Sequence, residues 1–160
     1  MLFCFVAGLM LCVLGAQATG ASVTDAQYSI TGGERFAAVT LDLRVFAEKD
    51  GWHSVSLIPA TAPLRCCKVR GKRGYIERQA DRHIAHLLGK GEYEIRLEFV
   101  LDVSRQGAER SVKLPLVRAG SGKVEFLLEK PGYAVMVAPE VPLQLEADKK
   151  CTRARIFPTD

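Results

Sequence analysis

The residue types that could perform chemistry are concentrated in the stretch RCCKVRGKRGYIERQADRHIAH, from Arg65 to His86. It contains two adjacent cysteines, a dense run of arginine and lysine, and two histidines three positions apart. These residue types suggest a metal centre, a redox dithiol or a surface that binds a polyanion. Each of these requires a different geometry, so the local structure expected for the stretch decides among them.

The histidines have the spacing HxxH, which would place two ligands on one face of a helix. The surrounding sequence HIAHLLG is typical of a strand, where His83 and His86 point to opposite faces. Asp81 and His83 share a face, as do Cys66 and Lys68, but neither pair is a ligand set. A structural zinc site usually needs four nitrogen or sulfur ligands. We therefore expect no metal site, and histidines on the surface of a hairpin.

The cysteine pair lacks the spacer of a CxxC motif, and no helix follows whose N-terminus would lower a thiol pKa. Neighbouring side chains of a strand point to opposite faces, so at most one thiol faces the core. The phase of Val69 favours Cys67 for the core, whereas Cys66 shares its phase with Leu64, which leaves the assignment open. A candidate disulfide joins Cys66 or Cys67 to Cys151, provided that the Cα atoms lie within about 7 Å.

The basic run is the stronger candidate for a function, because only Glu77 and Asp81 oppose it within the stretch. Around the turn GKRG these charges would crowd the tip of one hairpin, and an aromatic ring beside it would add a stacking surface. The candidate binding residues are Arg65, Lys68, Arg70, Lys72, Arg73, Tyr75, Arg78 and Arg82. Such a tip could hold anionic polysaccharide, lipid headgroups or the acidic face of another domain. The alternative is a solvated turn whose charges protect an edge strand from aggregation.

The elements expected to position these residues are strands. In EYEIRLEFVLDV the apolar residues occupy alternate positions from Tyr93 to Val103 and therefore fall on one face. AVTLDLRVFA, SVKLPLV and KVEFLLE alternate in the same way, and glycine-rich turns separate such runs roughly every eight to twelve residues. The pattern predicts an all-β fold, an antiparallel β-sandwich of about ten strands with little or no helix; a closed β-barrel is the alternative. Pro115 and Pro142 each remove a ladder donor, which predicts edge strands or bulges.

The first 18 residues are interpreted as a signal peptide. No charged residue occurs from Met1 to Ala16, and Ala16-Gln17-Ala18 fits the small-x-small rule for cleavage after Ala18. The apolar run is shorter than the roughly 20 residues that span a bilayer. Cleavage leaves residues 19–160 as a single domain of about 140 residues, with three cysteines that permit one disulfide. A basic n-region is missing, so a start further upstream and an uncleaved anchor are the alternatives.

Several segments follow one another in a familiar order: ITGGERFAAVTLDLRVFA, GWHSVSLIPATAPL, GKGEYEIRLEFVLDV, RSVKLPLV and TRARIFPTD. This order resembles the N-terminal β-sandwich regions of large, uncharacterised exported bacterial proteins. The resemblance implies a β-sandwich in the bacterial envelope without catalytic residues to carry over. It also implies that the chain is the N-terminal part of a longer protein.

No catalytic motif is present: GxSxG, HExxH and a phosphate-binding glycine loop are all missing, and the net charge of +4 is modest. We expect a non-catalytic exported module, without cofactor or metal, that is periplasmic, on the cell surface or secreted. It would act in interaction with another envelope domain or protein, or as a structural spacer. The alternative is a binding domain for an acidic glycan or anionic surface polymer through residues 65–82. A third reading is an accessory domain of a larger envelope enzyme. Nucleic acid is not an expected partner, and membrane contact is expected only through an uncleaved signal or a segment beyond Asp160.

Overall fold

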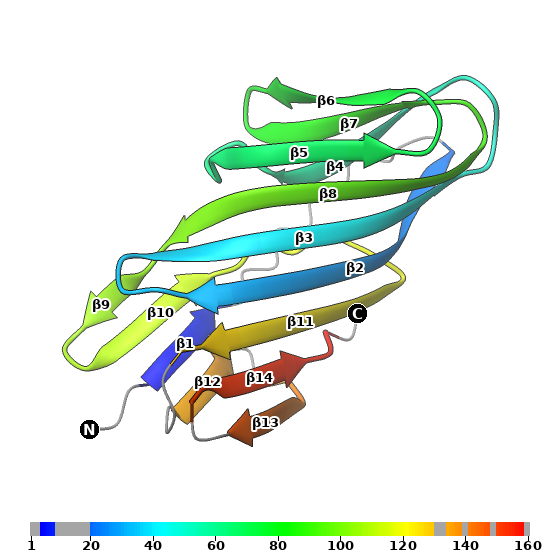
Figure 1. Ribbon diagram of the computed structural model, residues 1–160. Helices are drawn as coiled ribbons and strands as arrows, with labels where there is room; N and C mark the ends of the chain where they lie inside the picture. The colour runs from blue at the N-terminus through cyan, green and yellow to red at the C-terminus, as the bar shows by residue number, and fades with distance from the viewer. Residues whose placement is uncertain (1–3, 9–19, 130–133, 139–140, 148–149, 159–160) are drawn as a thin grey trace.

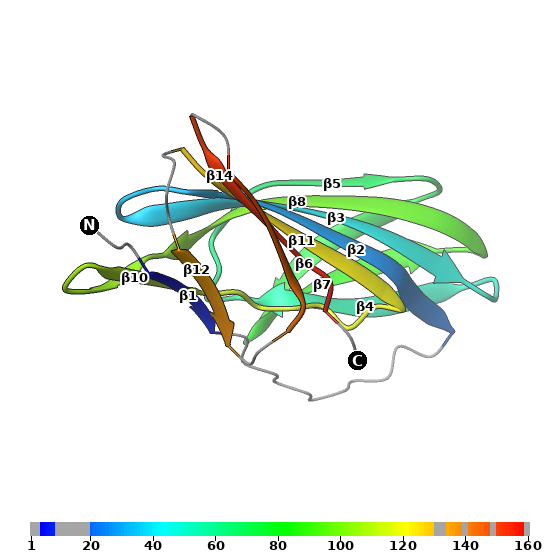
Figure 2. The same ribbon diagram turned by 90° about the horizontal axis from the view of Figure 1, so that it is seen from below.

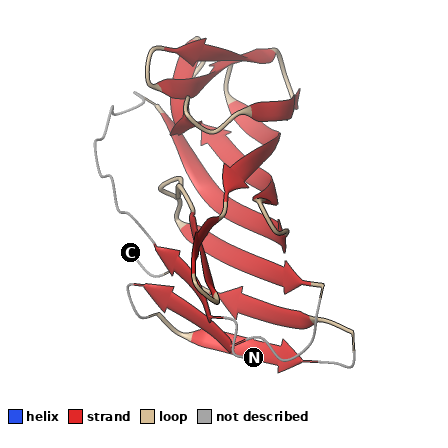
Figure 3. Ribbon diagram, turned by 90° about the vertical axis from the view of Figure 1, so that its left-hand side faces the viewer, coloured by secondary structure: helices blue, strands red, loops and turns tan. Residues whose placement is uncertain are grey.

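The computed structural model describes residues 4–8, 20–129, 134–138, 141–147 and 150–158. None of these residues lies in a helix, and hence none of them forms a helix that could cross a membrane. Strands and loops make up the whole of the described chain (Figure 3). The strands are β1 (Cys4–Gly8), β2 (Ala21–Gly32), β3 (Phe36–Ala47), β4 (Trp52–Pro59), β5 (Leu64–Arg70), β6 (Gly74–Gln79), β7 (Arg82–Leu88), β8 (Gly91–Asp102), β9 (Ser104–Gln106), β10 (Glu109–Lys113), β11 (Ser121–Leu128), β12 (Ala134–Ala138), β13 (Leu143–Ala147) and β14 (Thr152–Ile156).

These strands form three sheets (Figure 1). The largest has seven strands in the order β13-β14-β11-β2-β3-β8-β5, the second has four in the order β12-β1-β10-β9, and the third has three in the order β4-β7-β6. Seen from below, the seven-stranded sheet forms one layer, and β1, β10, β12 and β4 lie on one side of it (Figure 2). The predicted all-β sandwich is therefore confirmed, and the described strands do not close into a barrel, because the large sheet ends at β13 and β5.

The structure differs in detail from the predicted antiparallel sandwich of about ten strands. The described chain has fourteen strands in three sheets, and β2 pairs with β11 in parallel, as β1 does with β10 and β12. The strands that the pattern missed are short or largely exposed, such as β9, and carry no alternation of apolar and polar residues. Parallel strands are far apart in the sequence and are not connected by a hairpin turn, so the sequence pattern does not indicate which strands pair.

The hydrophobic core lies on the inner face of the seven-stranded sheet, as the alternation predicts. In β3 every second residue from Ala37 to Ala47 is buried, and in the neighbouring β8 Tyr93, Ile95, Leu97 and Phe99 are buried opposite them. Both prolines lie just outside strands, since β10 ends before Pro115 and β13 begins after Pro142. A missing ladder donor is thereby avoided.

Part of the predicted signal peptide belongs to a sheet. Cys4–Gly8 forms β1, which pairs with β10 on one side and with β12 on the other. The remaining residues of 1–18, including the predicted cleavage site, lie outside the described residues. Cleavage after Ala18 would remove the strand that joins β10 to β12, so removal of the segment stays a prediction.

Candidate functional site

The basic stretch does not form one hairpin, which corrects the prediction. β5 pairs with β8 at the edge of the seven-stranded sheet, whereas β6 and β7 pair with each other in the three-stranded sheet. Gly71, Lys72 and Arg73 connect the two sheets. The true hairpin is β6–β7, and its turn lies at Ala80 and Asp81.

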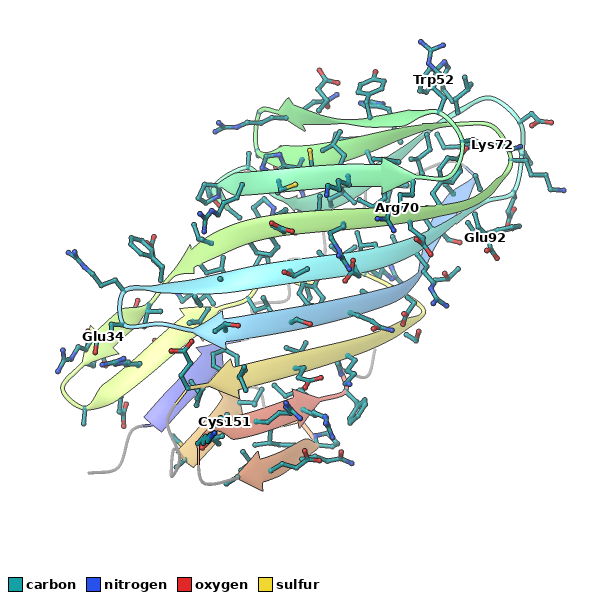
Figure 4. All side chains as sticks on the ribbon, viewed as in Figure 1. Glu34, Trp52, Arg70, Lys72, Glu92 and Cys151 are labelled. Carbon is teal, nitrogen blue, oxygen red and sulfur yellow. The ribbon has the colours of Figure 1, made fainter. Side chains whose placement is uncertain are left out.

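The predicted binding residues consequently point in several directions. Lys68 and Arg70 lie on the outer face of the seven-stranded sheet, opposite Arg96 and Glu94 of β8. Arg65 lies at a bulge between Leu64 and Cys66. Figure 4 shows Arg70 at the end of β5, on the side of β8, and Lys72 in the connection that follows. The structure thus disperses charges that the sequence places together.

On β6 and β7 the predicted residues divide between two faces. Tyr75 is paired with His86, and the alternation of the strand puts Arg78, opposite His83, on the other face of the sheet. Arg82 lies on the face of Tyr75, where its Nη1 donates to Ser56 Oγ at 3.1 Å.

The outer face of the seven-stranded sheet carries a shallow hollow beside β5, lined by charges of both signs. Within it the guanidinium of Arg96 donates to both carboxylate oxygens of Asp42, at 2.6 and 2.9 Å. This bidentate contact raises the pKa of Arg96. Lys68 and Arg70 line the hollow together with Asp25 and Glu94, so the positive charge of β5 meets acidic neighbours within its own sheet.

The outer face of the three-stranded sheet holds a cluster of aromatic rings, which we call the aromatic face: Trp52, Tyr75 and His86. Trp52 and Tyr75 are 54% and 52% exposed. Their ring centroids are 5.8 Å apart with the ring planes at 69°, and the Tyr75 ring stacks on that of His86 at 4.9 Å. Ser54 and Tyr75 flank His86 on either side in the strand register, so β4, β7 and β6 each supply one residue to the same row.

A hydrogen-bond network holds the central ring of this cluster. His86 Nε2 lies 3.1 Å from Glu77 Oε2, and His86 Nδ1 lies 3.1 Å from Ser54 Oγ. When Nε2 carries the proton and donates it to Glu77, Nδ1 accepts the hydroxyl proton of Ser54. Gln79 Nε2 donates to the same Glu77 oxygen at 3.3 Å. Since both ring nitrogens are engaged, the His86 ring is fixed and holds the Tyr75 ring that stacks on it.

From the sequence, Tyr75 and Arg82 were named as candidate binding residues and His86 only as a surface histidine, whereas Trp52 and Ser54 were missed. Trp52 and Ser54 alternate with the buried residues His53 and Val55 of β4, so a large aromatic side chain stands on the polar side of a strand. An aromatic residue at a polar position of the alternation was the sequence feature that could have identified Trp52. The pairing of Trp52 with Tyr75 brings together residues from different strands, and nothing in the sequence specifies it.

The two histidines of the HxxH spacing lie on opposite faces, as predicted, but only His86 is at the surface. His83 is 5% exposed, and its Nε2 lies 3.3 Å from the carbonyl oxygen of Ala62. The expectation of two surface histidines was therefore wrong for His83, because β7 lies at the centre of its sheet and turns one face to the core. Among the described residues, no three His, Cys, Asp or Glu side chains gather in a way that could hold a metal ion.

The cysteines do not occupy the places expected for them. A bulge after Leu64 puts Cys66 opposite Glu98 and Cys67 opposite Leu97, yet Cys67 is exposed because β5 is an edge strand. Cys151 precedes β14, and four strands separate β14 from β5. At about 4.8 Å per strand this separation is on the order of 20 Å, far beyond the reach of a disulfide. The candidate disulfide with Cys151 is thus incompatible with the strand order.

Cys67 is expected to react with a thiol reagent faster than Cys66. Its side chain is exposed at a sheet edge, whereas that of Cys66 is partly covered, and alkylation requires access to the sulfur. A short pulse of iodoacetamide on the folded chain, followed by peptide mapping, measures both rates. Recovery of a peptide pair cross-linked through Cys151 would contradict the strand order described above.

Comparison with known proteins supplies a fold relationship and no family. No family model matches the chain, and no curated protein matches it. Among solved structures, an M1 zinc metallopeptidase E323A mutant from Deinococcus radiodurans is similar to 86% of this chain, with a TM-score of 0.53 and 12% identity. Yeast LTA4 hydrolase in complex with bestatin is similar to 88% of it, with a TM-score of 0.51 and 7% identity.

The chain spans only part of these structures, 39% of the metallopeptidase chain and 29% of the hydrolase chain. At such low identity the likeness defines a shared β fold and carries over no catalytic residue. The class established here is therefore an all-β domain with the architecture of one part of larger peptidase and hydrolase chains.

Proposed function

We propose that this chain is a non-catalytic accessory domain of a larger enzyme of the zinc metallopeptidase type. The observation that carries the proposal is the asymmetry of coverage: most of this chain matches, but it accounts for little more than a third of the peptidase chain. A β domain that recurs inside enzymes of this kind is suited to support or shape a catalytic part without containing it.

The side chains described here support an auxiliary role. His53 and His83 are buried, and each has a ring nitrogen close to a backbone carbonyl oxygen, of Lys49 and Ala62 respectively. His86 is engaged by Glu77 and Ser54. A general base needs an available proton acceptor beside a substrate. His86 is engaged at both ring nitrogens, and His53 and His83 are buried away from any substrate, although His83 Nδ1 has no hydrogen-bond partner among the described residues.

We also propose that the domain works in the bacterial envelope. The apolar, uncharged segment from Met1 to Ala16 and the sequence Ala16-Gln17-Ala18 support export. In that setting the partner of the domain would be an envelope protein or another domain of the same enzyme.

The proposal is tested by comparing the recombinant chain with the protein isolated from its native cells. The purified chain is expected to release no fluorophore from aminoacyl-methylcoumarin substrates in the presence of zinc. An antibody against the chain should precipitate an assembly that hydrolyses them, and a zinc chelator should abolish that activity. Precipitates free of chelator-sensitive activity, from cells that produce the chain, would overturn the proposal.

A further inference from the structure

We propose that the aromatic face of the three-stranded sheet is a binding platform for an acidic oligosaccharide. Trp52 and Tyr75 would stack on sugar rings, and Arg73 and Arg82 would bind carboxylates along the same oligomer. This site differs from the basic tip that the sequence suggests, and it does not depend on the proposed enzymatic partner.

The stacking surface follows from exposure and ring geometry. Trp52 and Tyr75 each leave about half of their surface to solvent although their rings contact one another edge to face. A sugar presents C–H groups on its ring faces and hydroxyls around the rim, and the C–H groups pack favourably on the electron-rich face of an aromatic ring. Ser54 and Gln79, on the same face of the sheet, offer a hydroxyl and an amide to the rim of the sugar.

The platform is rigid before any ligand arrives. The Tyr75 ring stacks at 4.9 Å on His86, whose two nitrogens are held by Ser54 and Glu77. Large aromatic side chains that are already fixed lose little conformational entropy on binding. A cross-strand aromatic pair stabilises a sheet without further hydrogen bonds. The two hydrogen bonds of His86 are therefore not needed for stability and favour a role in holding the rings for a ligand.

The charges around the rings select an anionic ligand. Glu77 on this face is engaged by His86 and Gln79. Arg82 lies at one end of β7, where it donates to Ser56 and its Nε lies 3.8 Å from the exposed carboxylate of Asp81, which a ligand carboxylate would displace. At the other end, the amide of Leu88 donates to the carbonyl oxygen of Arg73 at 2.8 Å. This hydrogen bond extends the pairing of β6 with β7 by one residue. Because Arg73 lies two residues before Tyr75, its side chain is on the same face of the sheet.

The separation of the two arginines indicates an oligomer as the ligand. Leu88 and Arg82 are six residues apart on β7, which corresponds to roughly 20 Å at about 3.3 Å per residue. A single sugar cannot contact both ends, whereas an extended chain of uronic acids can reach both guanidinium groups and cross the rings between them. Guanidinium groups bind carboxylates with two parallel hydrogen bonds.

Trp52 is the only tryptophan of the chain, so intrinsic fluorescence reports on the platform directly. Titration of the purified chain with oligogalacturonate is expected to change this fluorescence saturably. The matching neutral galactose oligomer should bind at least about tenfold more weakly, since it lacks the charge-assisted hydrogen bonds. Raising the salt concentration should lower the affinity for the acidic oligomer and leave the affinity for the neutral oligomer unchanged.

Variants separate stacking from charge. Tyr75→Ala, followed by fluorescence, and Trp52→Ala, followed by calorimetry, should each lower the affinity about tenfold or more. Arg82→Gln should lower the affinity for the acidic oligomer and leave the affinity for the neutral oligomer unchanged. Phe36→Ala is the matched control, because Phe36 is equally exposed, at 55%, but lies on β3 of the seven-stranded sheet. Thermal unfolding of every variant verifies that it remains folded.

Two outcomes would overturn this inference. The first is a fluorescence signal that does not change with the acidic oligomer, or affinity that survives both aromatic substitutions. The second is that saccharides leave the fluorescence unchanged while Trp52→Ala and Tyr75→Ala no longer associate with the native peptidase assembly. The aromatic face would then be a protein interface. The titration uses the chain alone, so its failure is distinguishable from failure of the proposed accessory role.

Discussion

Replacing Gly71 by alanine is expected to lower the free energy of unfolding by about 2–4 kcal/mol. Gly71 connects β5 to β6 with a φ of +117°, which side chains disfavour. A Cβ atom at this position would lie 2.8 Å from the carbonyl oxygen of Glu92 and 3.4 Å from Cα of Tyr93. Both obstacles are backbone atoms of β8, so relief requires the connection between the two sheets to move.

Gly51→Ala is the matched control for this substitution. Gly51 has a similar φ of +111°, but a Cβ there meets no atom within 4 Å. It should therefore cost only the backbone strain, about 1–2 kcal/mol. Urea unfolding with linear extrapolation measures both variants. Equal losses would show that β8 does not approach Gly71 as described.

Replacing Tyr28 by phenylalanine is expected to cost about 1–3 kcal/mol, although the ring is retained. The Tyr28 hydroxyl is buried, accepts a hydrogen bond from the amide of Val117 at 2.7 Å and donates to the carbonyl oxygen of Pro115 at 3.3 Å. It thereby fastens the segment between β10 and β11 to β2. Without it, two backbone groups lose their partner in a site that water reaches poorly. The half-exposed Tyr75, changed to phenylalanine, should alter the stability by less than about 0.5 kcal/mol.

The hydroxyl of Tyr28 also makes the free energy of unfolding depend on pH, with a sign that follows from its burial. Burial raises the pKa of Tyr28 above its ordinary value of 10.0, and the hydrogen bond from Val117 only partly opposes this. The unfolded chain therefore releases this proton at lower pH than the folded chain, and stability falls as the pH rises above about 10. Tyr28→Phe should lose stability less steeply in that range. An identical slope in both proteins, measured by urea unfolding between neutral and alkaline pH, would contradict the buried hydroxyl.

The faces of the long strands were predictable, because burial in β3 and β8 repeats with the period of two that their sequences show. Polar residues such as Asp42 and Arg96 stand opposite each other on the outer face for the same reason. A residue pattern of this kind is local. It reports which side of a strand meets the core, and it was correct wherever the apolar alternation was long.

The pattern did not reveal which strands share a sheet. Arg70 and Gly74 are close in sequence but belong to different sheets, so the basic stretch divides between them. Conversely, Trp52 and Tyr75 come from separate strands that are joined only through β7. Sheet membership depends on packing between distant segments, and a bulge of one residue at Arg65 was enough to change the phase of the cysteines.

The proposed function makes this chain one domain of a larger enzyme. The most direct measurement is the size and metal content of the assembly that contains the chain in its native cells, by immunoblotting of sized fractions and elemental analysis. We predict a species much larger than 160 residues alone would give, with zinc in the same fractions. Recovery of the chain only at its own size, in fractions without zinc, would contradict the proposed function.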